Sequence, residues 1–410
     1  MSERSPRRVI QIHESVIGPP APRPRSIRPR KVADYPDVPA AYLEVAQKLS
    51  SPLLMGPPIC DELIAFVHHV FTEEEASLVR HLRKYHKKTA DEIARLEHRP
   101  PDAVAPILRR LAVEKRAIAC DDSKGARRYM LMPIFPGIFE MVLIGVAPDA
   151  LTDWHRRFSE LFEALYETGY STEYFDRRAP YVKFLPVHQS IEAHPMALPS
   201  QRLEVIFDRF EAFGVGHCQC RMAEQANGRG CGRPTGNCIA AGRFAEAGIR
   251  DGWLRSISKA SALALKAEAE SHGLVTWIMN VQSDKGQLTC SCCGCCCHAM
   301  RLVSEFNAPG LMAPPHFTPR LDAARCNHCG RCARQCPMAA LTVDLKAKTL
   351  ARKAERCIGC GLCALACDNA HAISMEPVPA NELPYRSWFA LMMHNLPGQA
   401  RSIWKVWRNR

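Results

Sequence analysis

CNHCGRCARQCPMAALTV, residues 326–343, and CIGCGLCALACDNAHAISM, residues 357–375, decide the fold of the C-terminal part of this chain. Both stretches space their cysteines as CxxCxxCxxxC, so the second repeats the first and indicates an internal duplication. Cysteines two or three residues apart do not readily form unstrained disulfides with one another, whereas their thiolates suit a compact metal ion or cluster. The repeat therefore predicts two metal-binding half-sites.

The two stretches resemble bacterial two-cluster ferredoxins. In that family three closely spaced thiolates bind three irons of one 4Fe-4S cube, and the fourth thiolate binds the neighbouring cluster. The resemblance implies two 4Fe-4S clusters in a ferredoxin-like dicluster domain over residues 320–377. It also implies crossed ligand sets: Cys326, Cys329, Cys332 and Cys367 for one cluster, and Cys357, Cys360, Cys363 and Cys336 for the other.

The residues between these cysteines agree with the resemblance in most places. Glycines at 330, 359 and 361 let backbone N–H groups approach the cluster sulfurs, and Pro337 follows the first motif as it does in the family. Asp368 stands where the second motif would have proline. A shielded carboxylate there would lower the cluster potential, whereas an exposed one would matter little. Structural zinc is the alternative for the eight cysteines, but the repeated spacing is more specific for clusters.

A second group of cysteines lies in GHCQCR (216–221), CGRPTGNC (231–238) and CSCCGCCCH (290–298). Buried structural cysteines are usually scattered singly, so packing rarely explains thiols this dense. We therefore expect a central metal centre, with either a further Fe-S cluster or zinc. Its candidate ligands are Cys218, Cys220, Cys231, Cys238, Cys290, Cys292, Cys293, Cys295, Cys296 and Cys297.

The sequence leaves the partition of these ten cysteines open. The first four could form one set, or two of them could join ligands from residues 290–297. The region, with its CxCR, GNC and CxCCxCCC segments, resembles uncharacterised 4Fe-4S proteins that join such a region to a C-terminal dicluster ferredoxin. That resemblance covers most of residues 130–376 and implies another redox centre. Arg221 and Arg233 are candidates to stabilise a reduced cluster, or are ordinary surface arginines. His217 and His298 are candidate ligands or hydrogen-bonding neighbours.

Helix and strand signals upstream resemble a winged helix-turn-helix over residues 58–147. Thr72 with Glu75 and Thr89 with Glu92 form capping boxes that open two helices, and a third helix follows at 101–111. Two strand-like runs, 117–120 and 126–132, then flank a loop that contains Gly125. Cys60 and Cys120, which stand alone, are expected to be structural.

The remaining patterns complete an α+β multidomain architecture. A chain of 410 residues predicts two to four folding units. A cysteine-rich central α+β domain is expected over residues 148–307, with helices near 152–169, 203–213 and 258–273. The predicted connections are a basic proline-rich tail at 1–57 with one short helix at 40–49, a linker at 308–319, and a basic aromatic tail at 378–410 that Pro397 and Gly398 divide.

Neither export nor a membrane span is indicated by the sequence. Arg7 and Arg8 precede no apolar segment long enough for a signal, and the chain has no run of about 18 apolar residues, so a cytoplasmic location is expected. The net charge of +12 fits a nucleic acid, an acidic protein or an anionic membrane surface. The aromatic C-terminal tail suits peripheral membrane contact or a partner groove, and packing on the body is the alternative.

These features favour an electron-transfer component of an oxidoreductase system, with a reductase or dehydrogenase as its redox protein partner. The alternative is an Fe-S redox-sensing winged-helix regulator that binds DNA. Its recognition helix would offer mainly Arg109 and Arg110, and its wing Lys124, Arg127 and Arg128, which is a set better suited to phosphate than to bases. An enzyme with its own substrate site is a third hypothesis. The chain has no Walker A or GxGxxG segment to support direct use of ATP or NAD.

Overall fold

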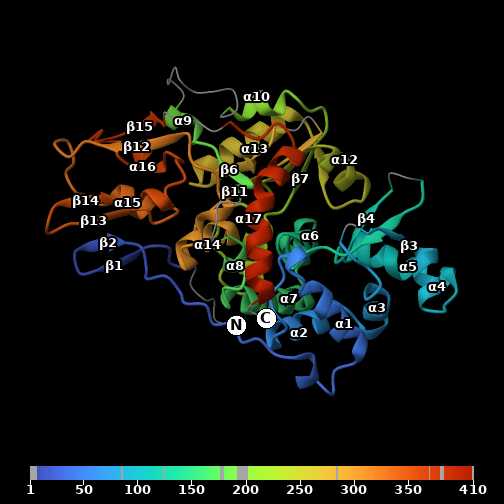
Figure 1. Ribbon diagram of the computed structural model, residues 1–410. Coiled ribbons are helices and arrows are strands. Elements are labelled where there is room, and N and C mark those ends of the chain that lie inside the picture. The colour runs from blue at the N-terminus through green and yellow to red at the C-terminus, as the bar shows by residue number, and fades with distance from the viewer. Residues whose placement is uncertain are drawn as a thin grey trace. The chain divides into compact units, whose positions relative to one another are not determined.

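The computed structural model describes residues 7–84, 86–122, 125–175, 180–191, 202–282, 285–368, 370–378 and 383–408. The described chain mixes helix and sheet, as the predicted α+β class requires (Figure 1). It divides into two compact units. We call Pro24–Tyr174 with Arg401–Arg410 the helical unit, and Met1–Arg23 with Phe175–Ala400 the cysteine-rich unit.

The helical unit is organised by helices with one apolar face. The predicted short helix at 40–49 is confirmed as α1. Phe66 of α2 and Phe158 of α7 meet with ring centroids 5.5 Å apart, and both side chains are fully buried. The predicted boundary at 147 therefore differs from the unit boundary, because burial of its apolar face packs α7 against α2. The helices are α1 Ala40–Leu49, α2 Asp61–Val70, α3 Glu73–Val79, α4 Ala90–Leu96, α5 Pro101–Arg109, α6 Phe139–Ile144, α7 Asp153–Glu167 and α8 Thr172–Phe175.

Both predicted capping boxes are confirmed. The Thr72 hydroxyl accepts a hydrogen bond from the Glu75 N–H at 3.2 Å, and Thr89 accepts one from Glu92 at 3.3 Å. After α5 the predicted hairpin forms from β4 (Ala119–Asp121) and β5 (Arg128–Met130), and β3 (Lys88–Thr89) pairs with the other edge of β5. The winged-helix assignment itself stays a prediction, because these strands are only two or three residues long.

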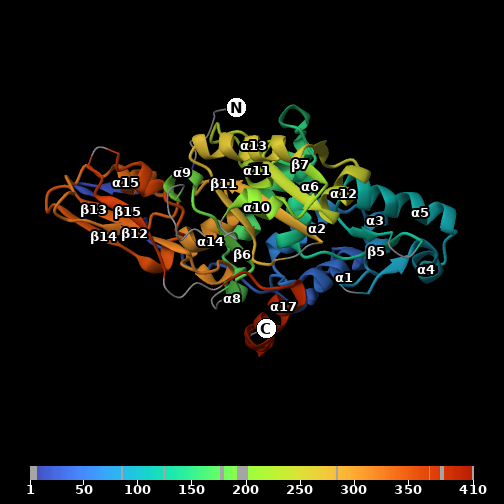
Figure 2. The same cartoon turned by 90° about the horizontal axis from the view of Figure 1, so that it is seen from above.

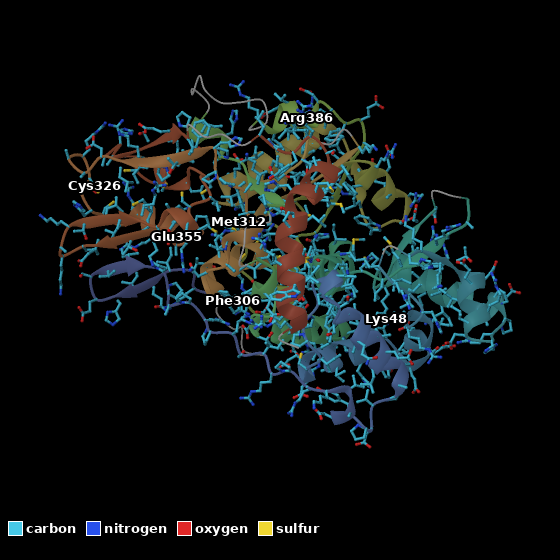
Figure 3. All side chains as sticks on the ribbon, viewed as in Figure 1. Lys48, Phe306, Met312, Cys326, Glu355 and Arg386 are labelled. Atoms are coloured by element: carbon cyan, nitrogen blue, oxygen red, sulfur yellow. The ribbon has the colours of Figure 1, made fainter. Side chains whose placement is uncertain are left out.

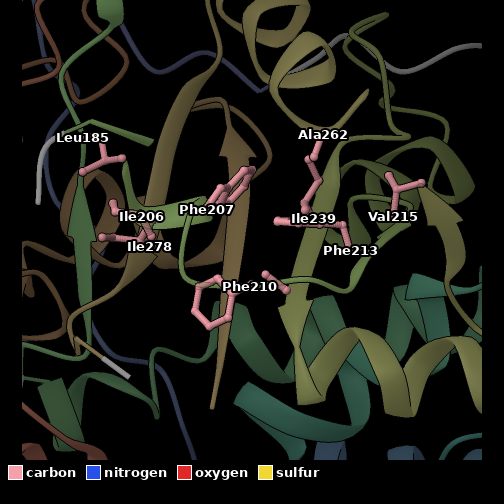
Figure 4. Packing of buried hydrophobic residues seen from close by; sticks show 10 residues of the cluster. Leu185, Ile206, Phe207, Phe210, Phe213, Val215, Ile239, Ala262 and Ile278 are labelled. Atoms are coloured by element: carbon pink, nitrogen blue, oxygen red, sulfur yellow. The ribbon is translucent and has the colours of Figure 1, made fainter. Parts of the chain in front are cut away.

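One six-stranded antiparallel sheet forms the centre of the cysteine-rich unit, in the order β6-β10-β11-β8-β7-β9. Helix α13 contacts β7, β10 and β11, and Figure 2 shows the sheet and its helices from above. The core between them buries Phe207, Phe213 and Ile239 (Figure 4). The strands are β6 Val182–Phe184, β7 Phe213–Gly216, β8 Cys238–Gly242, β9 Arg255–Ile257, β10 Val275–Met279 and β11 Gly286–Cys292. The helices are α9 His188–Ile191, α10 Leu203–Phe207, α11 Gln219–Ala226, α12 Arg243–Arg250, α13 Lys259–Ser271 and α14 His298–Phe306.

The C-terminal cysteine repeat folds around two further strand pairs. Strand β12 (Phe317–Leu321) pairs with β15 (Ile373–Pro377), and β13 (Leu341–Asp344) pairs with β14 (Thr349–Arg352). Short helices α15 (Arg331–Gln335) and α16 (Leu362–Leu365) carry the third cysteine of each motif. Figure 3 labels Cys326 and Glu355 within this part.

The segment predicted as a linker, residues 308–319, is built into the fold. Met312 bridges to Val182 of β6, and the Ala313 N–H donates to the Val182 carbonyl at 2.8 Å. From Phe317 onward the segment is strand β12. Its prolines interrupt regular structure without preventing these pairings, so the segment joins the central sheet to the cysteine repeat through direct hydrogen bonds.

Part of the predicted N-terminal tail also differs from expectation. Strands β1 (Gln11–His13) and β2 (Val16–Gly18) form a hairpin, and β2 pairs with β13 to give the sheet β1-β2-β13-β14 (Figures 1 and 2). Burial of one apolar side chain explains why this segment pairs with β13. Ile17 is fully buried among Cys332, Leu341 and Val343, which gives a basic segment one strong apolar anchor.

The predicted division of the C-terminal tail is wrong. Helix α17 runs from Trp388 to Arg408 with Pro397 inside it. Its first turns are held by Leu391, which is fully buried against Met279 and Val281, as expected if the tail packs on the body. Among the described residues, no helix has both the length and the apolar character needed to cross a membrane.

Replacing Ile17 tests whether the N-terminal hairpin is part of the cysteine-rich unit. Ile17→Ala should destabilise the sheet by about 2–5 kcal/mol, because it leaves a cavity in a packed core. The expected readout is faster amide hydrogen exchange in β13 and β14. Ile12→Ala is the matched control, since Ile12 is 62% exposed on the same hairpin. Equal exchange in the two variants would contradict this role for Ile17.

Candidate metal centres

The first candidate centre surrounds a small cavity in the C-terminal repeat. Cys357, Cys360 and Cys363 line it together with Cys336 from the other motif. The short helices α15 and α16 contact each other, which carries the fourth cysteine of one motif to the other motif's cavity. These are the four thiols that the ferredoxin resemblance assigns to one cluster.

A second small cavity lies in the same part of the chain. It is lined by Cys326, Cys329, Cys332 and, from the second motif, Cys367. In both cavities three cysteines of one motif lie with the fourth cysteine of the other motif, as the ferredoxin resemblance implies. Each cavity is lined by four thiols, which is the number that one cube needs, since its four irons each bind a different thiolate.

Backbone groups at these cavities favour bound, deprotonated thiolates. The Ala340 N–H donates to Cys336 Sγ at 3.2 Å. Gly359 and Gly361 have positive φ, and an added Cβ would come within 2.3 Å of the Phe317 carbonyl and 2.1 Å of the Ser190 hydroxyl, respectively. Burial raises the pKa of Cys332 to about 11. Burial thus opposes deprotonation of the free thiol. A metal that replaces the proton removes this free-energy cost, because coordinated thiols are deprotonated.

Asp368, which replaces the expected proline, lies at the surface. Its carboxylate pairs with Arg331 at 2.8 Å, and its side chain is 61% exposed. Solvent and the arginine both screen its charge. Asp368 is therefore an exposed carboxylate and not a shielded one. We expect it to have little effect on the cluster potential.

Residues 318–368 match the family model of the 4Fe-4S dicluster domain. We use that name for this part of the chain. Neither the curated proteins nor the solved structures contain a match to this chain. The match indicates iron-sulfur binding in the dicluster domain, while the central cysteines are interpreted from their own geometry.

Four central thiols form a compact set. The sulfur atoms of Cys231, Cys293, Cys295 and Cys296 all lie within 4.8 Å of one another. A tetrahedral ion with metal–sulfur bonds of about 2.3 Å separates its ligands by about 3.8 Å. The set therefore fits one tetrahedral ion closely. It differs from the dicluster cavities, where a cube would hold its four thiolates farther apart.

The local fold explains why neighbouring cysteines diverge here. Strand β11 ends at Cys292, a turn carries residues 293–296, and Cys297 is the N-cap of α14. The turn residues Cys293, Cys295 and Cys296 join Cys231, whereas the strand and N-cap cysteines do not. Sequence spacing alone could not reveal this division, because it depends on where the strand ends and the helix begins.

Cationic side chains lie against the central thiols. Arg233 donates to Cys295 Sγ at 3.7 Å, and although burial alone would lower the pKa of Arg233, nearby thiolates raise it. Arg221 is only 2% exposed and donates to the Ser291 carbonyl at 2.8 Å and to the Asn237 side-chain oxygen at 2.6 Å. The surface-arginine alternative is therefore wrong for Arg221.

The two candidate histidines are placed differently. His298 is fully buried, with Nδ1 3.4 Å from Cys220 Sγ. His217 Nδ1 lies 3.1 Å from the Thr235 hydroxyl. His298 is thus a hydrogen-bonding neighbour of a thiol, and the His217 ring hydrogen-bonds to Thr235.

The dicluster domain and the compact thiol set touch through their backbones. A Cβ added to Gly294 would lie 1.9 Å from the Pro337 carbonyl oxygen, so only glycine fits there. Gly294 separates Cys293 from Cys295, and Pro337 follows Cys336. The contact therefore joins a ligand loop of the central set to a ligand segment of the dicluster domain. The sequence around Gly294 does not indicate this role, because Pro337 lies more than 40 residues away along the chain.

Two of the five cationic side chains that favoured DNA binding, Arg110 and Arg127, are paired within the helical unit. Arg110 contacts Glu75 at 3.2 Å, and Arg127 makes two hydrogen bonds of 2.8 Å with Asp122. Lys124 lies outside the described residues.

Burial raises the pKa of Cys60 to about 12, which fits its expected structural role.

Crossed ligation in the dicluster domain can be tested with paired serine variants. Cys336→Ser with Cys357→Ser should remove one cluster, about four irons, because both thiols line one cavity. Cys336→Ser with Cys329→Ser should remove two clusters. Iron and acid-labile sulfide per chain provide the measurement. Uncrossed ligation predicts the reverse order of losses and would contradict the assignment.

Proposed function

We propose that this chain is an iron-sulfur electron-transfer protein that relays electrons between two 4Fe-4S clusters and a central metal-thiolate centre. The ligands would be the two crossed sets in the dicluster domain and the compact set around Cys231. The observation that carries the relay is the contact between Gly294 and Pro337. It supports a short route, because electron transfer weakens steeply as the distance between centres grows.

This contact supports a particular order of the centres. Pro337 adjoins Cys336, which lines the cavity of Cys357, Cys360 and Cys363. That cluster is therefore the neighbour of the central centre, and the cluster at Cys326 is the distal one. Iron at the central site would carry an electron, whereas zinc would give the site a structural role only.

The distal cluster offers the better position for a redox protein partner. Cys329 is exposed, while Cys360 and Cys363 are buried. Arg325 and Arg334 are exposed beside it, and Arg334 donates to the Cys329 carbonyl at 3.0 Å. These cations favour a partner with carboxylates around its own redox centre, since complementary charge steers association. A reductase or dehydrogenase of an oxidoreductase system is the proposed class.

The relay predicts a specific effect of Gly294→Ala. The added methyl group must push the two ligand loops apart, so electron redistribution between the central centre and the dicluster domain should slow at least tenfold. Gly236→Ala is the matched control, because a Cβ at Gly236 meets no atom within 4 Å. Chains reduced by about one electron and frozen at intervals would be followed by EPR.

Both glycine variants should retain the metal content of the unaltered protein. Unchanged redistribution in a metal-replete Gly294→Ala chain would contradict the proposed route. A central centre that accepts no electron over the whole range of potentials would contradict the relay itself, and would assign the compact site a structural role.

A further inference from the structure

Six cysteines of the central region remain outside the compact set, and the fold gathers them. Cys238 lies on β8, while Cys290 and Cys292 lie two residues apart on β11 and so point to the same face. Cys218 and Cys220 lie at the start of α11, and Cys297 caps α14. We call these residues the six-thiol set: Cys218, Cys220, Cys238, Cys290, Cys292 and Cys297.

Pairing of β8 with β11 and contacts at the starts of α11 and α14 bring the thiols of this set together. Strands β8 and β11 pair Thr289 with Ile239, so their register brings Cys290 opposite Cys238, and the two sulfur atoms are 3.5 Å apart. Gln219, which lies between Cys218 and Cys220, donates to Cys238 Sγ at 3.5 Å. His298, which follows Cys297, lies with Nδ1 3.4 Å from Cys220 Sγ. The starts of α11 and α14 and the strands β8 and β11 thus bring all six thiols into one region.

The surroundings of the six-thiol set favour negative charge. Cys218 and Cys297 occupy the N-cap positions of α11 and α14, so the positive end of each helix dipole lies beside a thiol. Arg221 is buried beside the set, and its Nε has no hydrogen-bond partner among the described residues. Lys266, also 2% exposed, donates to the Ser291 hydroxyl at 3.1 Å, between Cys290 and Cys292. Two buried cations need nearby anions.

We propose that the six-thiol set is a second central metal centre, separate from the compact set, which binds more than one iron or zinc ion through thiolates. One tetrahedral ion uses four sulfurs, and so does one 4Fe-4S cube. Two tetrahedral ions that share two bridging thiolates use six. Thiolate-only ligation selects soft or borderline metals, which excludes magnesium and calcium from this site.

The neighbouring cysteines provide matched variants in the full-length chain. Cys292→Ser with Cys297→Ser removes two thiols of the six-thiol set, and Cys293→Ser with Cys296→Ser removes two of the compact set. Metal would be counted per chain after anaerobic purification. The first pair should lose two or more ions and the second pair about one. The combined variant should lose the sum.

Several results would overturn this inference. The first pair losing one ion or none would do so, as would a combined variant that loses no more than either pair alone. The dicluster EPR signal serves as the folding control and separates this inference from the proposed relay. Loss of iron from the dicluster domain alone would count against the relay and leave the six-thiol centre standing.

The unaltered protein gives a second test that no folding defect can obscure. Under native anaerobic conditions the six thiols should resist alkylation by iodoacetamide, and removal of metal by a chelator should expose them. Mass spectrometry identifies the modified cysteines. A Cys238–Cys290 disulfide in the native protein, or protection unchanged by the chelator, would contradict the proposal.

Discussion

Thiolates brought together in a protein interior repel one another unless cations lie among them, and this constraint governs the cysteine-rich unit. Apart from Cys60 and Cys120, every cysteine of the chain belongs to this unit. The segments that carry these cysteines are strand ends, turns and helix N-termini that are distant in sequence. Metal bound between these segments would stabilise the fold directly, because its binding energy becomes folding energy. The apolar contacts, such as that of Ile17, add to this framework.

The sequence predicted the dicluster domain well because its ligands are local. Cys326, Cys329 and Cys332 lie within seven residues, so spacing alone defines a half-site, and the repeat supplies the other half. The capping boxes at Thr72 and Thr89 were predictable for the same reason, since both partners of each hydrogen bond lie within one helical turn. Family resemblance supplied the crossing of the two sets.

What the sequence could not predict depends on distant pairings. Cys292 and Cys293 are adjacent, yet they belong to different sets because a strand ends between them. The hairpin at residues 11–18 pairs with β13, more than 300 residues away, and its basic composition suggested a tail. The role of Gly294 depends on its close contact with Pro337, which the local sequence does not indicate. Each of these features requires the position of a second segment.

Iron and acid-labile sulfide per chain in the anaerobically purified, unaltered protein test the central claim most directly. Two cubes contribute about eight irons and about eight sulfides. We therefore expect at least about eight irons and eight sulfides per chain. Metal ions bound by the central thiols, iron or zinc, should add to this number. Intact protein that contains almost no labile sulfide would contradict this claim, because the dicluster domain would then hold no clusters.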